Sequence, residues 1–137
     1  NIAMRHPDIF TSVLSIAPGF LNENEFDLAL ESWRWDKGFL QSYGAAFSPN
    51  LELEYPYANI PSIEMPESEK AIVEDWKNGF GYWGDKIDTY LELNHSLTGI
   101  HIMYASNDSH KWIPSGCEYV SSLLMAKEIN ILVMLWL

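Results

Sequence analysis

The order of apolar and polar residues predicts three short strands. Residues 9–17 (IFTSVLSIA) and 98–106 (TGIHIMYAS) are apolar runs with many β-branched side chains, each followed by turn-forming residues. The run 131–137 (ILVMLWL) has the length of a strand and no polar interruption. Such nearly continuous hydrophobicity is typical of strands covered on both faces, so we expect a parallel sheet with both faces buried.

Helical patterns alternate with these strands. Residues 1–8 (NIAMRHPD) have the pattern of a helix that ends in a His-Pro-Asp turn, and residues 114–130 have the apolar spacing of a further helix. A helix that leads into a strand through a tight turn is half of a βαβ unit. Residues 1–19 and 98–137 therefore predict an α/β fold with a doubly wound, mainly parallel sheet. The apolar positions of the later helix are Tyr119, Val120, Leu123, Leu124 and Ile129.

Residues 20–97 differ in composition from the regions on either side. They hold 15 of the 19 acidic residues and 14 of the 19 aromatic residues. Residues 26–47 have a helical pattern, whereas residues 51–68 contain three prolines and should be extended and irregular. Two further helices are predicted from Ser68 and from Asp85. We interpret residues 20–97 as a cap-like insertion.

Both ends of the chain fall inside predicted elements. Asn1 lies within a helical pattern, and Leu137 lies within an apolar strand. We therefore expect residues 1–137 to be an internal piece of a longer protein and to form a single, partial α/β domain.

Composition excludes several classes of partner. The 137 residues are 47% hydrophobic and carry a formal net charge of −11. Binding to nucleic acid needs clustered Lys and Arg, so this class is disfavoured. No run approaches the roughly 18 apolar residues of a membrane span, and we expect none. The single cysteine, Cys117, cannot form an internal disulfide, and the oligomeric state stays open.

One stretch, IHIMYASNDSHKWIPSG from Ile100 to Gly116, ends an apolar strand with the carboxylate of Asp108. Asn and Asp favour turns because they hydrogen-bond to the nearby backbone. Ligands of open α/β sheets bind at the carboxyl ends of the strands, where Asp108 would also suit the acid of a Ser–His–Asp triad. The spacing alone leaves both interpretations open.

The other members of such a triad have no clear counterpart. The chain contains no G-x-S-x-G elbow, and in hydrolases of this architecture the histidine follows the last strand. We expect the nucleophile before Asn1 and the base after Leu137. His110 is two residues from Asp108 in one turn, which is poor geometry for a base and its orienting acid. We interpret His110 as a solvated loop residue.

No cofactor or metal is expected. The histidines lack H-x-x-x-H or H-E-x-x-H spacing, and no glycine-rich phosphate loop follows a strand. The acidic stretch NENEFD lacks the glycine and the final glutamate of a calcium loop. Aromatic residues of the middle region could line a sugar or aromatic pocket, but packing is the favoured interpretation for Trp33, Trp76 and Trp83.

These segments resemble a family. NIAMRHPDIFTSVLSIAPGF resembles the segment after the nucleophile elbow in serine esterases of the α/β-hydrolase superfamily, in the group of esterase D, enterochelin esterase, feruloyl esterase and mycolyltransferases. YGAAFSPN resembles the loop that continues into a proline-rich stretch in that group. MYASNDSHKWIPSGCEYVSSLLMAKEIN resembles its acid-bearing strand, loop and helix, although Ala105-Ser106 stands where many relatives have a glycine.

The resemblance implies a partial α/β-hydrolase fold and a parent protein that hydrolyses carboxylic esters. It carries over only Asp108, at the position of the triad acid. The implied substrate is a small-molecule or polysaccharide-linked ester. An acyltransferase of the same fold and a non-catalytic carbohydrate- or peptide-binding module remain the alternatives. Because two triad members are missing, we expect residues 1–137 alone to be inactive.

Overall fold

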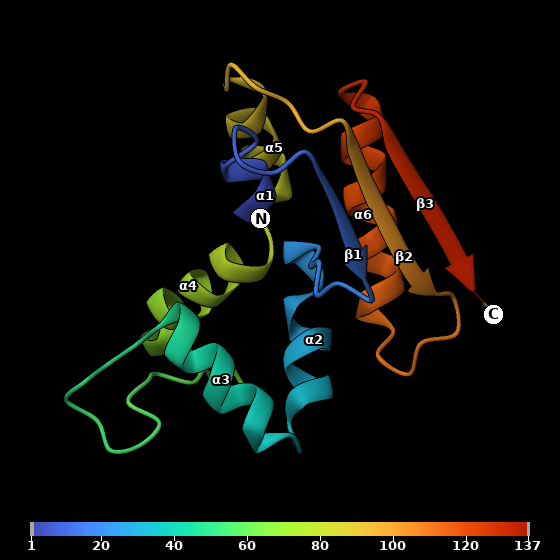
Figure 1. Ribbon diagram of the computed structural model, residues 1–137. Coiled ribbons are helices and arrows are strands. Elements are labelled where there is room, and N and C mark those ends of the chain that lie inside the picture. The colour runs from blue at the N-terminus through green and yellow to red at the C-terminus, as the bar shows by residue number, and fades with distance from the viewer. Residues whose placement is uncertain (1, 137) are drawn as a thin grey trace. The chain divides into compact units, whose positions relative to one another are not determined.

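The computed structural model describes residues 2–136 and has a mixed α/β architecture (Figure 1). The chain divides into two compact units. The first comprises Asn1–Asn22 and Tyr82–Leu137 and is called the sheet unit below. The second comprises Glu23–Gly81 and is called the helical unit. Each unit has its own core.

The sheet unit contains three parallel strands in the order β1-β2-β3. They are β1 (Ser12–Ile16), β2 (Gly99–Ala105) and β3 (Ile131–Trp136), so the three predicted strands and their parallel direction are confirmed. The central strand β2 pairs with both neighbours. The helices of this unit are α1 (Ile2–Arg5), α5 (Trp83–Leu91) and α6 (Trp112–Ala126).

The core of the sheet unit follows from the alternation of side chains along β2. Ile100, Ile102 and Tyr104 are buried at every second position, because successive side chains of a strand point to opposite faces. They pack against Val120 and Leu124 of α6, two of the positions that the helical spacing predicted. Residues of α1 and α5 complete the same cluster, namely Met4, Trp83, Ile87 and Tyr90.

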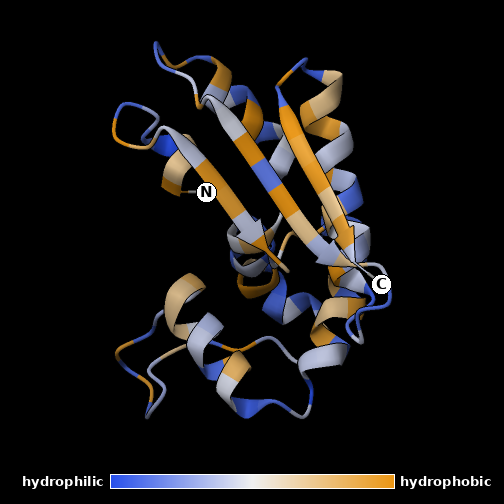
Figure 2. Cartoon of the chain, turned by 45° about the vertical axis from the view of Figure 1, so that its right-hand side comes forward, coloured by the Kyte–Doolittle hydropathy of each residue, from blue (hydrophilic) through white to orange (hydrophobic). Residues whose placement is uncertain are grey.

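The prediction that both faces of the sheet are buried is wrong for the described residues. Leu14 is 53% exposed and Leu132 is 50% exposed, and Trp136 at the end of β3 is also exposed. The reason is that α1, α5 and α6 all contribute to one cluster, on the face that carries Ile102. Figure 2 shows the three strands in front of α5 and α6, with hydrophobic residues along most of β3.

The helical unit contains α2 (Phe26–Trp33), α3 (Lys37–Phe47) and α4 (Lys70–Phe80), with 3-10 turns at Glu23–Glu25 and Glu67–Glu69. The helical pattern predicted over residues 26–47 is therefore interrupted once. The break is physical: Asp36 caps α3, since its Oδ1 accepts a 3.0 Å hydrogen bond from the backbone N of Phe39.

Aromatic rings fill the core of the helical unit. Trp33 and Trp76 are almost completely buried, with ring centroids 6.3 Å apart, and Trp33 lies 4.9 Å from the ring of Phe80. The Trp76 Nε1 donates a 2.8 Å hydrogen bond to the Oγ of Ser48, which is also buried. These rings pack against each other, as predicted for Trp33 and Trp76.

The proline-containing segment is irregular, as predicted. Residues 48–66 contain turns and one isolated antiparallel bridge, between Pro49 and Ala58, and the peptide bond from Tyr55 to Pro56 is cis. The cap-like insertion over residues 20–97 stays a prediction. Residues 23–81 form the helical unit, whereas α5 packs with α6 in the sheet unit.

None of the helices within residues 2–136 combines the length and the hydrophobicity that crossing a bilayer requires.

Candidate functional site

Asp108 lies in the loop that joins the carboxyl end of β2 to α6, drawn in orange in Figure 1. The loop turns sharply after the strand: the backbone N of Asp108 donates a 3.3 Å hydrogen bond to the carbonyl oxygen of Ala105. Because β2 is the central strand of a parallel sheet, this loop is at the edge where open α/β sheets bind their ligands.

The carboxylate of Asp108 is fixed by the backbone of its own loop. Its Oδ1 accepts a 2.8 Å hydrogen bond from the backbone N of His110, the arrangement of an Asx turn. The structure records no other hydrogen bond to this carboxylate among residues 2–136. The side chain is partly exposed. The turn therefore orients the acid and leaves its second oxygen able to accept a further hydrogen bond.

Cys117 lies close enough to Asp108 to be affected by its charge. Burial, with smaller contributions from the negative charges of Asp108 and then Glu118, raises the pKa of the Cys117 thiol from its ordinary value of 9.0 to about 12. A thiol with this pKa is protonated at neutral pH, whereas cysteine nucleophiles react as thiolates. Cys117 is therefore a core residue beneath the loop and is unsuited to nucleophilic catalysis.

Burial also raises the pKa of the Tyr104 hydroxyl, with smaller contributions from Glu118 and Cys117. Tyr104 is the last buried side chain of β2. The interior next to the Asp108 loop thus carries two neutral groups, a thiol and a phenol, and disfavours additional charge.

The carboxyl ends of the other strands meet the same part of the sheet unit. After β3, the carbonyl oxygen of Trp136 accepts a 3.2 Å hydrogen bond from the backbone N of Ser106, which starts the Asp108 loop. After β1, Ala17 has a left-handed backbone with φ of 44°, and its N donates a 2.7 Å hydrogen bond to the carbonyl oxygen of Met103. The three strand ends are therefore joined by backbone hydrogen bonds.

Gly116 brings α6 into direct contact with the segment that follows β1. A Cβ atom at Gly116 would lie 2.0 Å from the carbonyl oxygen of Phe20, a distance that no real contact allows. Only glycine permits this approach without a shift of the backbone. The contact fixes the start of α6, and with it the far end of the Asp108 loop.

No histidine side chain reaches Asp108 within residues 2–136. The ring of His110 is exposed, and its link to Asp108 runs through the backbone N–H alone. His6 and His95 are exposed in loops, and His101 lies on β2 at a position that alternates with the buried ones. The described part of the chain also holds no cluster of three or more His, Cys, Asp or Glu side chains suited to a metal ion.

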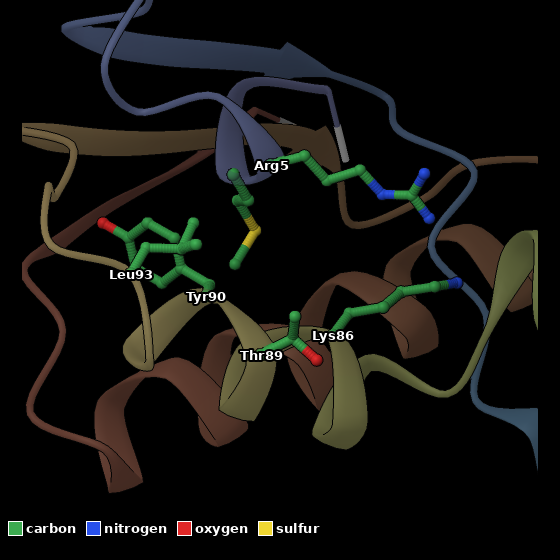
Figure 3. Close-up of a pocket in the computed structure, with 6 residues that line it drawn as sticks. Arg5, Lys86, Thr89, Tyr90 and Leu93 are labelled. Carbon is green, nitrogen blue, oxygen red and sulfur yellow. The ribbon is translucent and has the colours of Figure 1, made fainter.

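Sequence reasoning missed a second feature of the sheet unit, a small cavity between α1 and α5. It is lined by Met4 and Arg5 of α1 and by residues at one face of α5 and just beyond it (Figure 3). The spacing of Lys86, Thr89, Tyr90 and Leu93 follows the i, i+3, i+4, i+7 rule, which was the available signal. The partner helix α1 could not be inferred from that spacing.

The fold and the loop geometry define a mixed α/β protein with a parallel sheet whose strands alternate with helices, and with an acidic side chain at the carboxyl end of the central strand. No protein-family model, no curated protein and no solved structure matches this chain. Its function must therefore be argued from the residues themselves.

Proposed function

We propose that Asp108 is the acid of a Ser–His–Asp triad in a serine carboxylic-ester hydrolase of the α/β-hydrolase fold. The observation that carries the proposal is the carboxylate at the carboxyl end of the central parallel strand, held through Oδ1 by the His110 amide. A triad acid needs this arrangement, because it must be rigid and must keep one oxygen for the histidine.

The chemistry assigns one task to this residue. In such a triad the acid accepts a hydrogen bond from the histidine Nδ1–H and stabilises the imidazolium that forms when the histidine takes the serine proton. The serine oxygen attacks the ester carbonyl carbon, and backbone N–H groups stabilise the resulting oxyanion. In this proposal the serine and the histidine belong to segments outside residues 2–136 of the longer protein.

The surroundings of Asp108 support delivery of a histidine from a segment after β3. The carbonyl oxygen of Trp136 is bonded to Ser106, two residues before the acid. A segment that follows β3 would therefore begin beside the Asp108 loop. The helix α1 leads into β1 as the helix after a nucleophile elbow does in the esterases that this sequence resembles.

Two alternatives to this proposal differ in how they are tested. An acyltransferase would use the same triad and differ only in the acceptor, so a test must include an alcohol acceptor and measure which product forms. A sugar-binding module built on Trp33 and Trp76 is disfavoured, because these two rings are buried and cannot stack on a sugar ring.

The experiment compares variants of the natural gene product that contains residues 1–137. The substrate is p-nitrophenyl acetate, and a fluorophosphonate probe reports the reactive serine. Asp108→Asn should lower kcat by about 10⁴-fold with little change in KM, because the amide presents the wrong partner to the histidine. Circular dichroism verifies that the variant is folded.

The matched control is Asp8→Asn, which removes one carboxylate from an exposed turn before β1. It should stay within twofold of the unchanged protein. Residues 1–137 alone should show no turnover above the buffer rate. An Asp108→Asn variant of full activity, or activity that is lost in His110→Ala but retained in Asp108→Ala, would overturn the assignment.

A further inference from the structure

The connection between α3 and α4 exposes apolar side chains to solvent. Residues 50–57 lie between the bridged residues Pro49 and Ala58 and are called the tyrosine loop below. Figure 1 draws this connection in green, extending away from both helices. Exposed apolar residues that are scattered singly need no explanation, but several within one short loop form a patch that marks an interaction site. The exposed apolar side chains of the loop are Leu51, Leu53, Tyr55 and Tyr57.

Hydrogen bonds fix the base of the tyrosine loop to the core of the helical unit. The backbone N of Asn50 donates a 2.6 Å hydrogen bond to the carbonyl oxygen of Tyr57. The backbone N of Asn59 donates a 2.9 Å hydrogen bond to the carbonyl oxygen of Ser48, whose hydroxyl accepts the buried hydrogen bond from Trp76. A loop that is already ordered loses less entropy when a partner binds, so this base favours binding by the exposed side chains.

The side chains of the tyrosine loop combine two features that attract cations. The centroids of the Tyr55 and Tyr57 rings are 6.3 Å apart and their planes are at 87°, so the two rings form a corner. The carboxylates of Glu52 and Glu54 are exposed and form no ion pair within residues 2–136. Cations bind over the faces of aromatic rings and pair with carboxylates, so both features favour the same kind of ligand.

The charge of the surrounding sequence points to a cationic partner. Between Lys37 and Lys70 the chain contains five Glu residues and no Lys, Arg or His. A surface of one sign attracts partners of the opposite sign and repels those of its own sign. Nucleic acid and anionic lipid surfaces are therefore disfavoured at this loop, whereas a basic partner is favoured.

The exposure of the loop indicates the size of the partner. Small ligands bind in concave sites that bury most of their surface. Tyr55 is instead 73% exposed, so the loop cannot enclose a small ligand. A polypeptide that lies across the loop can cover several of its side chains at once. Tyrosine is also enriched among the residues that dominate the energy of protein interfaces.

We propose that the tyrosine loop binds a basic segment of a partner protein, in which Arg or Lys alternates with apolar residues. The cations of this segment lie over the two tyrosine rings and pair with the two carboxylates of the loop. Its apolar side chains cover Leu51 and Leu53. This inference is independent of the role proposed for Asp108.

The test uses the natural gene product that contains residues 1–137 and a fluorescein-labelled hexapeptide of alternating arginine and leucine. Fluorescence anisotropy should show saturable binding with a Kd on the order of 100 μM, as expected for a small exposed patch. A peptide with citrulline in place of arginine has nearly the same shape without the charge and should bind at least fivefold more weakly. A peptide with glycine in place of leucine keeps the charge without the apolar side chains and should also bind at least fivefold more weakly.

Aromatic variants test the contribution of the rings. Tyr55→Ala should weaken binding of the arginine–leucine peptide about fivefold, whereas Tyr55→Phe should retain most of it, because the face of the ring binds the cation. Trp35→Ala is the matched control, since it removes another exposed ring of the helical unit that lies outside the loop, and it should leave the Kd unchanged.

Charge variants test the contribution of the carboxylates. The double variant Glu52→Gln with Glu54→Gln should weaken binding about tenfold. The matched control is Asp8→Asn with Glu92→Gln, which changes the net charge by the same amount at exposed positions of the sheet unit and should stay within twofold. Raising the salt concentration to 0.5 M should weaken binding. Circular dichroism reports whether each variant is folded.

Several outcomes would overturn the proposal. They are equally tight binding of the citrulline peptide, an equal effect of the two double variants, and no saturation up to 20-fold above the expected Kd. Displacement of the peptide by maltohexaose would assign the loop to a sugar instead. Phosphatidylcholine vesicles that bind the unchanged protein but not Tyr55→Ala would assign it to a membrane.

The peptide measurement needs no enzyme activity, and Asp108→Asn should bind the peptide like the unchanged protein. Its failure would therefore leave the triad proposal standing, and failure of the esterase assay would leave this one standing.

Discussion

The two units of the chain stabilise their cores in different ways. The helical unit relies on rings: Trp33, Trp76 and Phe80 contact one another, and a buried hydrogen bond joins Trp76 to Ser48. The sheet unit packs one face of its central strand against helices. Strand β2 alternates buried and half-buried side chains, and Gly116 lets α6 approach the segment after β1.

This difference separates side chains that fill a core from side chains that could bind a ligand. The helical unit is rich in aromatic residues, but Trp33 and Trp76 serve to fill its core. The sheet unit instead holds a carboxylate oriented by a turn and a cavity lined by two cations. Aromatic composition alone therefore does not identify a binding site in the helical unit, because its largest buried rings fill the core.

The largest expected loss of stability tests the aromatic core of the helical unit. Trp76→Ala should lower the free energy of unfolding by about 3–5 kcal/mol, since it leaves a cavity and removes the indole N–H that donates to the buried Ser48 hydroxyl oxygen. Urea unfolding followed by circular dichroism measures it. The control is Trp35→Ala, because Trp35 is 85% exposed and its loss should change stability by no more than about 0.5 kcal/mol.

Equal losses for Trp76→Ala and Trp35→Ala would contradict a core built on rings. Ser48→Ala sharpens the result, because it deletes only the polar partner. The Trp76 N–H would then keep the carbonyl oxygen of Asn59, at 3.3 Å, so the loss should be smaller than that for Trp76→Ala.

The second effect tests the close approach in the sheet unit. Gly116→Ala should lower the free energy of unfolding by about 2–3 kcal/mol, because the new Cβ would overlap the carbonyl oxygen of Phe20 and force the backbone to move. Gly84→Ala is the matched control in α5, where a Cβ meets nothing within 4 Å. Removing that glycine should stabilise the helix by up to about 1 kcal/mol. A stabilised Gly116→Ala variant would refute the contact.

Much of the fold was accessible from local patterns. The three strands were predictable because each is a short apolar run that ends in turn residues, and α6 because its apolar side chains recur at helical spacing. Its start was placed two residues late. Pro114 is the third residue of α6, where its missing N–H costs nothing because first-turn amides have no partner in the helix.

The errors concern relations between elements distant in sequence. Continuous hydrophobicity in β3 predicted burial on both faces, but which faces are covered depends on where α1, α5 and α6 pack. The same limit applies to the sites. Asp108 follows from the strand that precedes it, whereas the cavity requires Arg5 and Lys86 to meet, and no local pattern specifies that meeting.

The smallest predicted effect concerns the charge of Asp108. Asp108→Asn should lower the pKa of the Cys117 thiol from about 12, because one of the negative charges that raise it is removed. The pKa should stay above 9.0, since burial is the larger cause. Glu118→Gln should lower it less, because the influence of Glu118 is smaller than that of Asp108. Asp8→Asn removes the same charge from an exposed turn before β1 and should leave it unchanged.

The pH dependence of stability measures this shift. The raised pKa of Cys117 means that the folded chain keeps its thiol proton where the unfolded chain has lost it. Its contribution to stability is therefore fully present below about pH 9 and is lost as the pH rises towards 12. Subtracting the pH dependence of stability measured for Cys117→Ser leaves the contribution of the thiol. In Asp108→Asn the loss should end at a lower pH. Identical pH-dependence curves for Asp108→Asn and Asp8→Asn would mean that the carboxylate of Asp108 points away from the thiol into water. That result would contradict an acid that is oriented by its loop.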